Sequence, residues 1–307
     1  MLVLAAKCLV GYWESLRDYG SPNARTALGV ILRIEGGDKM EEDLKKLEER
    51  SVYIIREAKA EFKDIAALWS TGKDSTACLH LCRKAFFGRI PFPVIHMDTG
   101  YKFPEIYKFR DRVAKEWGFN LVVAKNEEAI ESGMSPTRDG REKCCNLLKT
   151  QVLKDTIEEL GLKAVLVSIR WDEHGIRAKE RYFSPRDREF RWNFKNQPPE
   201  MWELFSKKFK EASHVRVHPI LHWSELNVWR YVQQEGLPVN PLYFAKDGKR
   251  FRSLGCMPCT VPIPSKADTI DEIVKELRTT KISERSGRSQ DKEKAYMMQK
   301  LRVLGYM

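Results

Sequence analysis

Short hydrophobic runs alternate along the chain with longer stretches in which apolar residues recur at helical spacing. The runs contain few polar positions, which is typical of strands buried on both faces; they cover residues 65–69, 90–97, 119–124 and 164–169. The helical stretches cover residues 41–63, 101–118 and 147–160. Strands that alternate with helices predict an α/β fold with a parallel sheet and helices on both of its faces.

The pattern becomes less regular in the last third of the chain. Residues 218–223 predict a strand and residues 225–235 a helix, with Ser224 as its N-cap. Because Asn227 takes the place of the Glu or Gln of a capping box, we do not expect a full box here. A further helix is expected at residues 269–279, within a segment that is otherwise rich in loops.

These patterns also suggest where the domains begin and end. Residues 1–39 are unlike the rest and form either an N-terminal extension or a segment before the true start. Residues 35–40 can be encoded by a purine-rich run that resembles a ribosome-binding sequence, which makes Met40 our expected start. We expect the main α/β domain at residues 40–235 and a loop-rich C-terminal segment at residues 236–307.

The first hydrophobic run ends abruptly in a polar turn before a helix begins. The turn consists of Ser70, Thr71, Gly72, Lys73, Asp74 and Ser75. Such a turn presents backbone N–H groups at the positive end of a helix dipole, which suits phosphate. Gly72 lets the backbone approach an anion, Lys73 adds a charge, the serines add hydroxyl donors, and Asp74 either caps the helix or serves a metal ion. The Walker spacing GxxxxGK[ST] is absent, and a turn with incidental polar residues is the alternative interpretation.

Polar residues also follow the second and fourth hydrophobic runs. Asp98 and Gly100 follow the second, and Arg170 begins a stretch rich in arginine that includes Arg177 and Arg181. Because ligands bind at the carboxyl ends of parallel strands, we expect these residues to lie at one edge of the sheet with the polar turn. Arginine binds phosphate and sulfate through two parallel hydrogen bonds, although a surface of solvated ion pairs would give a similar sequence.

Composition narrows the classes of partner and compartment. The formal net charge of +11 favours anionic partners, either nucleotides or nucleic acid. Seven cysteines in a chain of 307 residues do not suggest a secreted disulfide framework, and a reducing cytoplasm with metal ligation fits better. No hydrophobic run approaches the roughly 18 residues that span a bilayer, so we expect no membrane association.

Several motifs occur in the order known from one family. They are residues 51–62 (SVYIIREAKAEF), 70–75 (STGKDS), 91–111 (PFPVIHMDTGYKFPEIYKFRD), 170–192 (with RAKER and FSPRDREFRW), 196–202 (NQPPEMW), 251–256 (FRSLGC) and 283–288 (SERSGR). Through them the chain resembles the small subunits of bacterial sulfate adenylyltransferases. That family belongs to the phosphoadenosine phosphosulfate reductase branch of the PP-loop ATP pyrophosphatase superfamily. The resemblance spans nearly the whole chain from about residue 41 and implies an adenine nucleotide alpha hydrolase-like fold.

The resemblance implies that ATP and sulfate react to give adenosine 5'-phosphosulfate and pyrophosphate. The turn at residues 70–75, with Lys73, would hold the leaving pyrophosphate, and Asp74 would help to hold Mg²⁺ or cap the helix. Asp98 and Gly100 would lie against the nucleotide. The candidates for the charge on sulfate and the α-phosphate are Arg170, Arg177 and Arg181. Members of the family work beside a larger GTPase subunit of the elongation-factor type, so such a partner is implied as well.

Four cysteines resemble a different branch of the superfamily. The pair Cys144 and Cys145, with Cys256 and Cys259 in a CxxC motif, is similar to the pattern that holds a [4Fe–4S] cluster in assimilatory adenosine phosphosulfate reductases. Zn²⁺ on the same thiolates and four buried free thiols are the alternatives. We expect Cys144 or Cys145 to lie within ligation distance of the CxxC cysteines.

Three other functions remain open. A reductase would need a further nucleophilic cysteine, and none follows Cys259 in this sequence, so this activity is not expected. An enzyme that inserts sulfur into tRNA or DNA would use the cluster and bind nucleic acid, which the net charge allows. A catalytically silent nucleotide-binding subunit is the third, and the presence of Lys73, Asp74 and the arginines argues against it.

Overall fold

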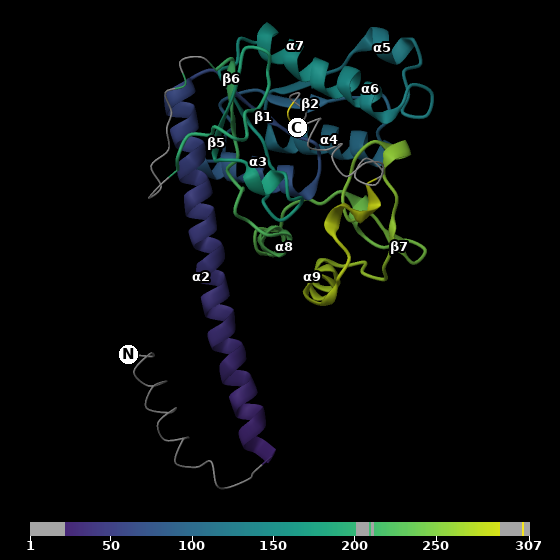
Figure 1. Cartoon of the computed structure of the whole chain (residues 1–307). Coiled ribbons are helices and arrows are strands. Elements are labelled where there is room, and N and C mark those ends of the chain that lie inside the picture. The colour runs from purple at the N-terminus through teal and green to yellow at the C-terminus, as the bar shows by residue number, and fades with distance from the viewer. Residues whose placement is uncertain (1–21, 201–208, 210–211, 289–302, 304–307) are drawn as a thin grey trace. The chain divides into compact units, whose positions relative to one another are not determined.

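The structure, a computed structural model, describes residues 22–200, 209, 212–288 and 303 (Figure 1). The chain divides into two compact units, Met1–Lys46 and Leu47–Met307. Helix α2 (Pro22–Phe62) begins in the first unit, where Lys46 and Glu42 form an ion pair of 2.7 Å. No helix in the described part of the chain is both long and apolar enough to cross a membrane.

Two of the predicted boundaries stay predictions. Of the expected extension, residues 1–21 lie outside the described residues and residues 22–39 are helical. The start at Met40 and the division between residues 235 and 236 are therefore matters for experiment.

A six-stranded sheet forms the centre of the second unit, in the order β3-β2-β1-β4-β6-β5. Its strands are β1 (Ile65–Leu68), β2 (Val94–Met97), β3 (Leu121–Ala124), β4 (Ala164–Leu166), β5 (Phe183–Arg186) and β6 (His214–Val217). All neighbours are parallel except β5, which runs antiparallel to β6. The four hydrophobic runs thus form the first four strands, and the predicted fold class is confirmed.

The prediction of a strand at residues 218–223 was wrong. Strand β6 begins at His214, and Pro219, which has no N–H to donate to a ladder, lies in the turns that follow. The edge strand β5 was also missed, because its polar residues suggested a surface. Arg186 is fully buried and pairs with Glu180 at 2.9 Å, so the charge is compensated inside the fold.

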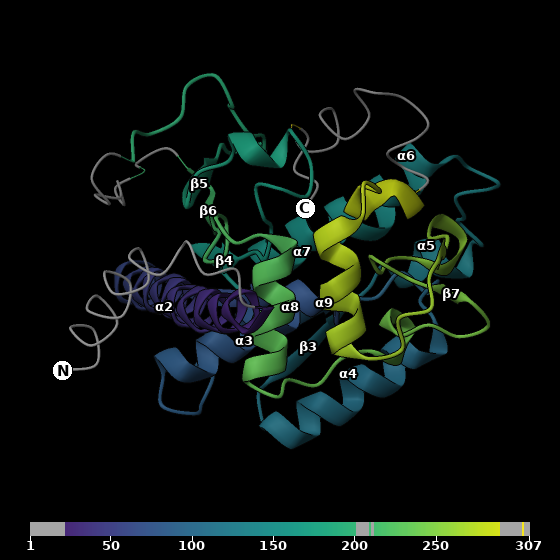
Figure 2. The same ribbon diagram turned by 90° about the horizontal axis from the view of Figure 1, so that it is seen from below.

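Helices cover both faces of the sheet. Right-handed crossovers place α3 (Lys73–Ala85) and α4 (Pro104–Trp117) on one face and α7 (Val152–Glu159) on the other (Figure 1). Helix α8 (Glu225–Gln234) packs on α3, and α9 (Ile270–Thr279) lies beside α8 (Figure 2). Each predicted helix is present, but the helix predicted from residue 41 begins at Pro22, whereas the boundaries of the others differ by a few residues.

Two local features differ from the sequence prediction. Ser224 and Asn227 form a reciprocal capping box, because Asn227 Oδ1 accepts from the Ser224 N–H at 2.9 Å while Ser224 Oγ accepts from the Asn227 N–H at 3.1 Å. A short separate helix, α5 (Glu127–Glu131), follows β3. The helix expected at residues 147–160 begins earlier than predicted, with α6 (Arg141–Cys145) leading directly into a π-helical stretch at Asn146–Gln151 and then α7. Such stretches are frequent at functional sites.

The C-terminal segment contains few helices and strands, as expected. It contains the hairpin of β7 (Lys249–Arg250) and β8 (Ile263–Pro264), helix α9 and the 3₁₀ turn Glu284–Gly287. Backbone bonds hold this turn in place, because the Val261 N–H donates to the Gly287 carbonyl at 2.9 Å. This bond ties the turn to the strand-like segment before β8.

Candidate active site

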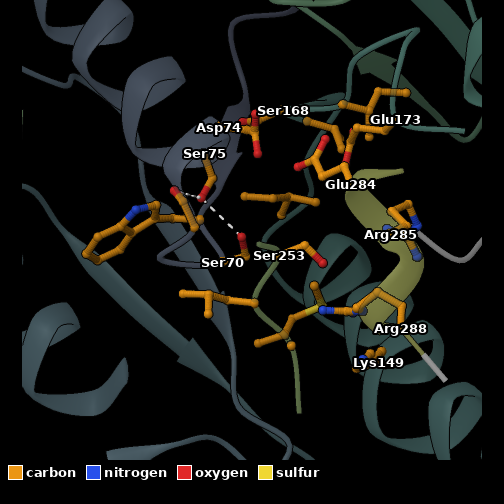
Figure 3. A pocket seen from close by; sticks show the side chains of 18 of the residues that line it. Ser70, Asp74, Ser75, Lys149, Ser168, Glu173, Ser253, Glu284, Arg285 and Arg288 are labelled. Carbon is orange, nitrogen blue, oxygen red and sulfur yellow. Dashed lines mark hydrogen bonds between the residues drawn. The ribbon is translucent and has the colours of Figure 1, made fainter. Parts of the chain in front are cut away.

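A pocket of about 160 Å³ lies at the carboxyl ends of β1 and β4 (Figure 3). The connections of these neighbouring strands leave toward opposite faces of the sheet, which opens a crevice between them. Ser70 and Ser75 line the pocket after β1, and Ser168 lines it after β4. Ser253 and Glu284 of the C-terminal segment form the opposite wall. The pocket therefore joins the polar turn to residues far away in the sequence.

The polar turn Ser70–Ser75, which we call the anion-binding loop after its predicted role, joins β1 to α3. Thr71 has a positive φ of 64°, whereas Gly72 is extended, with φ −77° and ψ 164°. Helix α3 begins at Lys73, and no side chain caps it, so Asp74 is not its N-cap. A Cβ added to Gly72 would lie 3.2 Å from the Tyr243 hydroxyl. Gly72 is thus needed for close approach rather than for an unusual backbone angle.

Lys73 is buried, although its place in a polar turn suggests an exposed side chain. Its side chain is 0% exposed, and its ammonium bonds Glu284, Asp74 at 3.1 Å and Glu225 at 3.9 Å. Burial would lower the pKa of Lys73, but Glu284 and Glu225 outweigh it and raise the pKa above its ordinary value. Lys73 is therefore a charged group held behind the pocket wall by carboxylates.

Arg170 joins the same network, and its side chain is also 0% exposed. Its guanidinium pairs with Asp172 at 2.9 Å and with both Asp74 and Glu284. Burial alone would lower the pKa of Arg170. The surrounding carboxylates, of which Glu284 has the largest effect, outweigh burial, so the pKa of Arg170 is raised above its ordinary value. Glu284 therefore bridges the two buried cations of the site.

The other two predicted arginines have different positions. Arg177 lines the pocket and pairs with Glu173. Arg181 is exposed and does not line the pocket, so its assignment as an acceptor ligand stays a prediction that this geometry does not favour. The physical reason is the 3₁₀ turn Arg177–Lys179, after which the chain runs out to the edge strand β5.

Asp98 and Gly100 lie beside the pocket but do not line it. The Asp98 carboxylate accepts from the Gly100 N–H at 2.9 Å and from the Tyr107 hydroxyl at 2.8 Å. Gly100 has a φ of 72°, so this turn has the left-handed conformation that glycine tolerates. Their contact with a nucleotide stays a prediction.

A second group of charged residues, missed by the sequence analysis, lines the far end of the pocket. We call Lys102, Lys149, Arg285 and Arg288 the cationic group. Lys149 comes from the π-helical stretch and the arginines from the turn Glu284–Gly287 and the residue after it, as the row of labelled side chains in Figure 3 shows. Only the spacing of SERSGR hinted at these arginines in the sequence, and nothing marked the lysines.

Like charges are crowded in the cationic group. Burial lowers the pKa of Lys102; the Cys256 thiol raises it, and Lys149 and Arg288 lower it again. Arg288 is buried, and its Nε atom has no hydrogen-bond partner among the described residues. Gly255 makes room for Arg288, because a Cβ at Gly255 would collide with the guanidinium. This arrangement favours a bound oxyanion.

The four predicted metal-binding cysteines are buried near the same end of the pocket. Burial, then the neighbouring thiols of Cys145, Cys256 and Cys259, raise the pKa of Cys144 to about 12. Burial raises the pKa of Cys256, but Lys149, Lys102 and a contact of 3.2 Å with Thr99 Oγ1 lower it to about 6.

The cysteine side chains do not converge on one point. Cys144 packs with Met134 and Leu148, whereas Cys145 packs with Ile176 and Trp192. Within the described ranges, no group of three or more His, Cys, Asp or Glu side chains is arranged to hold a metal ion. The expected thiolate site thus receives no support from the structure.

Comparison with solved structures supports the fold. Phosphoadenylyl-sulfate reductase from Candida auris superposes with a TM-score of 0.50 over 72% of this chain and 97% of that chain, at 18% identity. Yeast FAD synthetase in complex with FAD has a TM-score of 0.51 over 81% of this chain and 91% of that chain, at 16% identity. At such low identity these likenesses concern the fold alone.

Comparison of sequences is more specific. Sulfate adenylyltransferase subunit 2 of Psychromonas ingrahamii is 42% identical over 293 residues, covering 86% of this chain and 97% of the relative. The subunit 2 proteins of Proteus mirabilis and Pseudomonas aeruginosa are each 40% identical over the same shares. Residues 64–262 match the phosphoadenosine phosphosulfate reductase domain. The chain therefore belongs to the phosphoadenosine phosphosulfate reductase domain family, within which it is similar to sulfate adenylyltransferase subunit 2 over most of its length.

Proposed function

We propose that this chain is a nucleotidyltransferase that transfers the adenylyl group of ATP to sulfate, giving adenosine 5'-phosphosulfate and pyrophosphate. One observation supports the proposal: residues of the polar turn Ser70–Ser75 and all four residues of the cationic group line a single pocket. The reaction needs these two sites, because it joins one dianion to a triphosphate and releases another anion. The printed names of the relatives agree with it.

The chemistry assigns a task to each end of the pocket. A sulfate oxygen attacks the α-phosphorus, the bond from that phosphorus to the bridging oxygen breaks, and the electron pair leaves with pyrophosphate. The N-terminus of α3 and the hydroxyls of Ser70 and Ser75 stabilise the leaving group. Arg288 and Lys149 bind sulfate, and Arg177 faces the reacting phosphate between them. Asp98 and Gly100 contact the nucleotide from the loop after β2.

Mg²⁺ would fit this site as an ion whose ligands are mostly phosphate oxygens of the nucleotide. No set of three carboxylates converges in the described part of the chain, and Mg²⁺ commonly uses one or two carboxylates together with phosphate oxygens. Asp74 lines the pocket and is the carboxylate that would contribute. When bound, the ion neutralises charge on the phosphates.

A [4Fe–4S] cluster or Zn²⁺ on Cys144, Cys145, Cys256 and Cys259 is a proposal apart from this reaction. Its support is the donor chemistry and the mutual effect of the thiols on their pKa values. As placed, the side chains do not fit such a group, and adenylyl transfer requires none. Analysis of iron, zinc and labile sulfide in anaerobically purified protein tests it. A content near zero removes the cluster, and with it the main support for the sulfur-inserting alternative and its nucleic-acid partner.

A larger partner subunit follows from the same proposal. The relatives are named subunit 2, which implies another subunit, and we propose that it is a GTPase of the elongation-factor type. We place the complex in the cytoplasm, where ATP is supplied. Co-purification of a GTP-hydrolysing chain with this one would support the assignment, and isolation of a fully active single chain would contradict it.

The decisive experiment is exchange of labelled pyrophosphate into ATP by the purified complex, with and without sulfate. We expect exchange that depends on sulfate and is lost in Lys149→Met. The matched control is Lys115→Met, an exposed lysine near the end of α4 that should keep full activity. Exchange that is independent of sulfate, or an inert complex, would contradict the proposed function.

A further inference from the structure

Two residues of the C-terminal part of the chain satisfy the donors of the anion-binding loop. The Lys73 ammonium and the Arg170 guanidinium both bond the Glu284 carboxylate, one on each oxygen. The Lys73 backbone N–H, at the start of α3, donates to the Tyr243 hydroxyl at 3.0 Å. Glu284 is 7% exposed and Tyr243 2% exposed, so both contacts are inside the protein.

These contacts have the chemistry of a bound phosphate. A carboxylate that bridges a lysine and an arginine provides two negative oxygens to two cations, as a phosphoryl group does. The N–H at a helix N-terminus is the usual donor to a phosphate oxygen, and here a hydroxyl oxygen accepts from it. The chain therefore places its own oxygen atoms where the leaving pyrophosphate is expected to bind.

The small volume of the pocket also supports the view that side chains of the protein fill part of the phosphate site. Its volume of about 160 Å³ lies below the roughly 300–1,000 Å³ that is usual for small-molecule sites. Glu284 and Tyr243 both line it, so moving them would enlarge it on the side of the loop.

We propose that Glu284 and Tyr243 occupy the phosphate positions of the loop, and that the pyrophosphate part of the nucleotide binds by displacing them. The proposal rests on the proposed function for the identity of the ligand. Arg285 follows Glu284 in the same 3₁₀ turn, and Arg288 comes directly after that turn. Displacement of Glu284 therefore moves the arginines of the cationic group, which couples phosphate binding at one end of the pocket to the acceptor site at the other.

The opposite role for Glu284 would be to hold Lys73 and Arg170 ready for the phosphate. The two roles predict opposite effects of Glu284→Gln, which keeps the shape of the side chain and removes its charge. A displaced competitor predicts that pyrophosphate binds at least about tenfold more tightly to the variant, because a charge-assisted contact no longer has to be broken. A positioning group predicts weaker binding.

The test measures binding of inorganic pyrophosphate with Mg²⁺ by calorimetry to the wild type, Glu284→Gln and Tyr243→Phe. Glu276→Gln is the matched control, because Glu276 also pairs with an arginine, Arg250 at 2.7 Å, outside the pocket. We expect tighter binding in Glu284→Gln and Tyr243→Phe and no change in Glu276→Gln. Equal or weaker binding in Glu284→Gln overturns the proposal.

Hydrogen exchange of the wild type gives a second measurement that needs no variant. Pyrophosphate should slow exchange at the start of α3 and speed it at Glu284–Gly287, whereas a positioning role predicts slower exchange at both. Faster exchange at the turn supports displacement, and slower exchange there refutes it. If neither the wild type nor the variants bind pyrophosphate, both this proposal and the proposed function fail; binding without these differences removes this proposal alone.

Discussion

Gly255→Ala offers a sharp test of the acceptor site, because it acts on that site through one defined collision. A Cβ at residue 255 would overlap the Arg288 guanidinium, and its three nearest heavy atoms all belong to that group. To restore normal contact distances, the end of the arginine must move by roughly 1–2 Å. The substitution therefore displaces Arg288 without removing its charge.

The structure gives the size of the expected effect. A hydrogen bond between charged groups contributes about 1.5–3 kcal/mol, and a misplacement of about 1 Å can change a rate by about 100-fold. We expect the apparent KM for sulfate to rise about 10- to 100-fold in Gly255→Ala, with a smaller change in the KM for ATP. Because the end of a long side chain can shift, the free energy of unfolding should fall by no more than about 1–2 kcal/mol.

Steady-state kinetics with sulfate as the varied substrate provide the assay. Gly175→Ala is the control, since a Cβ there would meet no heavy atom within 4 Å. Arg288→Met should raise the KM for sulfate as much as Gly255→Ala, and the double variant should be no worse than either, because both act on one contact. A wild-type KM for sulfate in Gly255→Ala, together with a raised KM for sulfate in Arg288→Met, would show that the added Cβ does not displace Arg288. Wild-type values in both would exclude Arg288 from the acceptor site.

Three further predictions concern stability. Lys73→Ala should lower the free energy of unfolding in urea by about 3–5 kcal/mol, because it leaves buried carboxylates without their shared cation; an unchanged value would contradict the buried pairing. The pKa of Glu173 is held low because Arg177 and Arg170 outweigh burial, and that of Glu284 because Arg170 and Lys73 do so. Each carboxylate thus adds stability that is fully present above its ordinary pKa of 4.5 and is lost as the pH falls from there toward its lower folded pKa. The midpoint of thermal unfolding should therefore fall as the pH drops below 4.5, and less so in Glu173→Gln. Ser224→Ala should lower stability by about 1 kcal/mol by removing the cap of α8, and an unchanged midpoint would show that the capping box contributes nothing.

The sequence predicted those parts of the site whose signals are local. The strand, turn and helix around Ser70–Ser75 follow one another in the chain, so their pattern was sufficient to place the polar turn between β1 and α3. Four strands were found because each is an uninterrupted apolar run. The strand β6 (His214–Val217) was missed because its buried residues include arginine and histidine, so it is not an uninterrupted apolar run.

The electrostatic state of the site could not be predicted, because it depends on contacts across the chain. The place of Lys73 in a polar turn suggests an exposed side chain. In the fold its charge is paired with Glu225 of α8 and Glu284 of the C-terminal segment, which are distant from it in sequence. Lys149 carries no sequence signal, and a π-helical stretch gives it its place in the pocket.

The C-terminal segment also explains why the two ends of the pocket form together. Its turn supplies Glu284 to the loop end and Arg285 to the acceptor end, and Arg288 pairs with Thr260 through a backbone bridge just beyond. Any movement of this turn must change the partners of Lys73 and the position of the acceptor arginines at once. If pyrophosphate displaces Glu284, as we propose, its binding must also change the affinity of the pocket for the acceptor. The acceptor must then change the affinity for pyrophosphate by the same factor, since coupling between two equilibria acts equally in both directions.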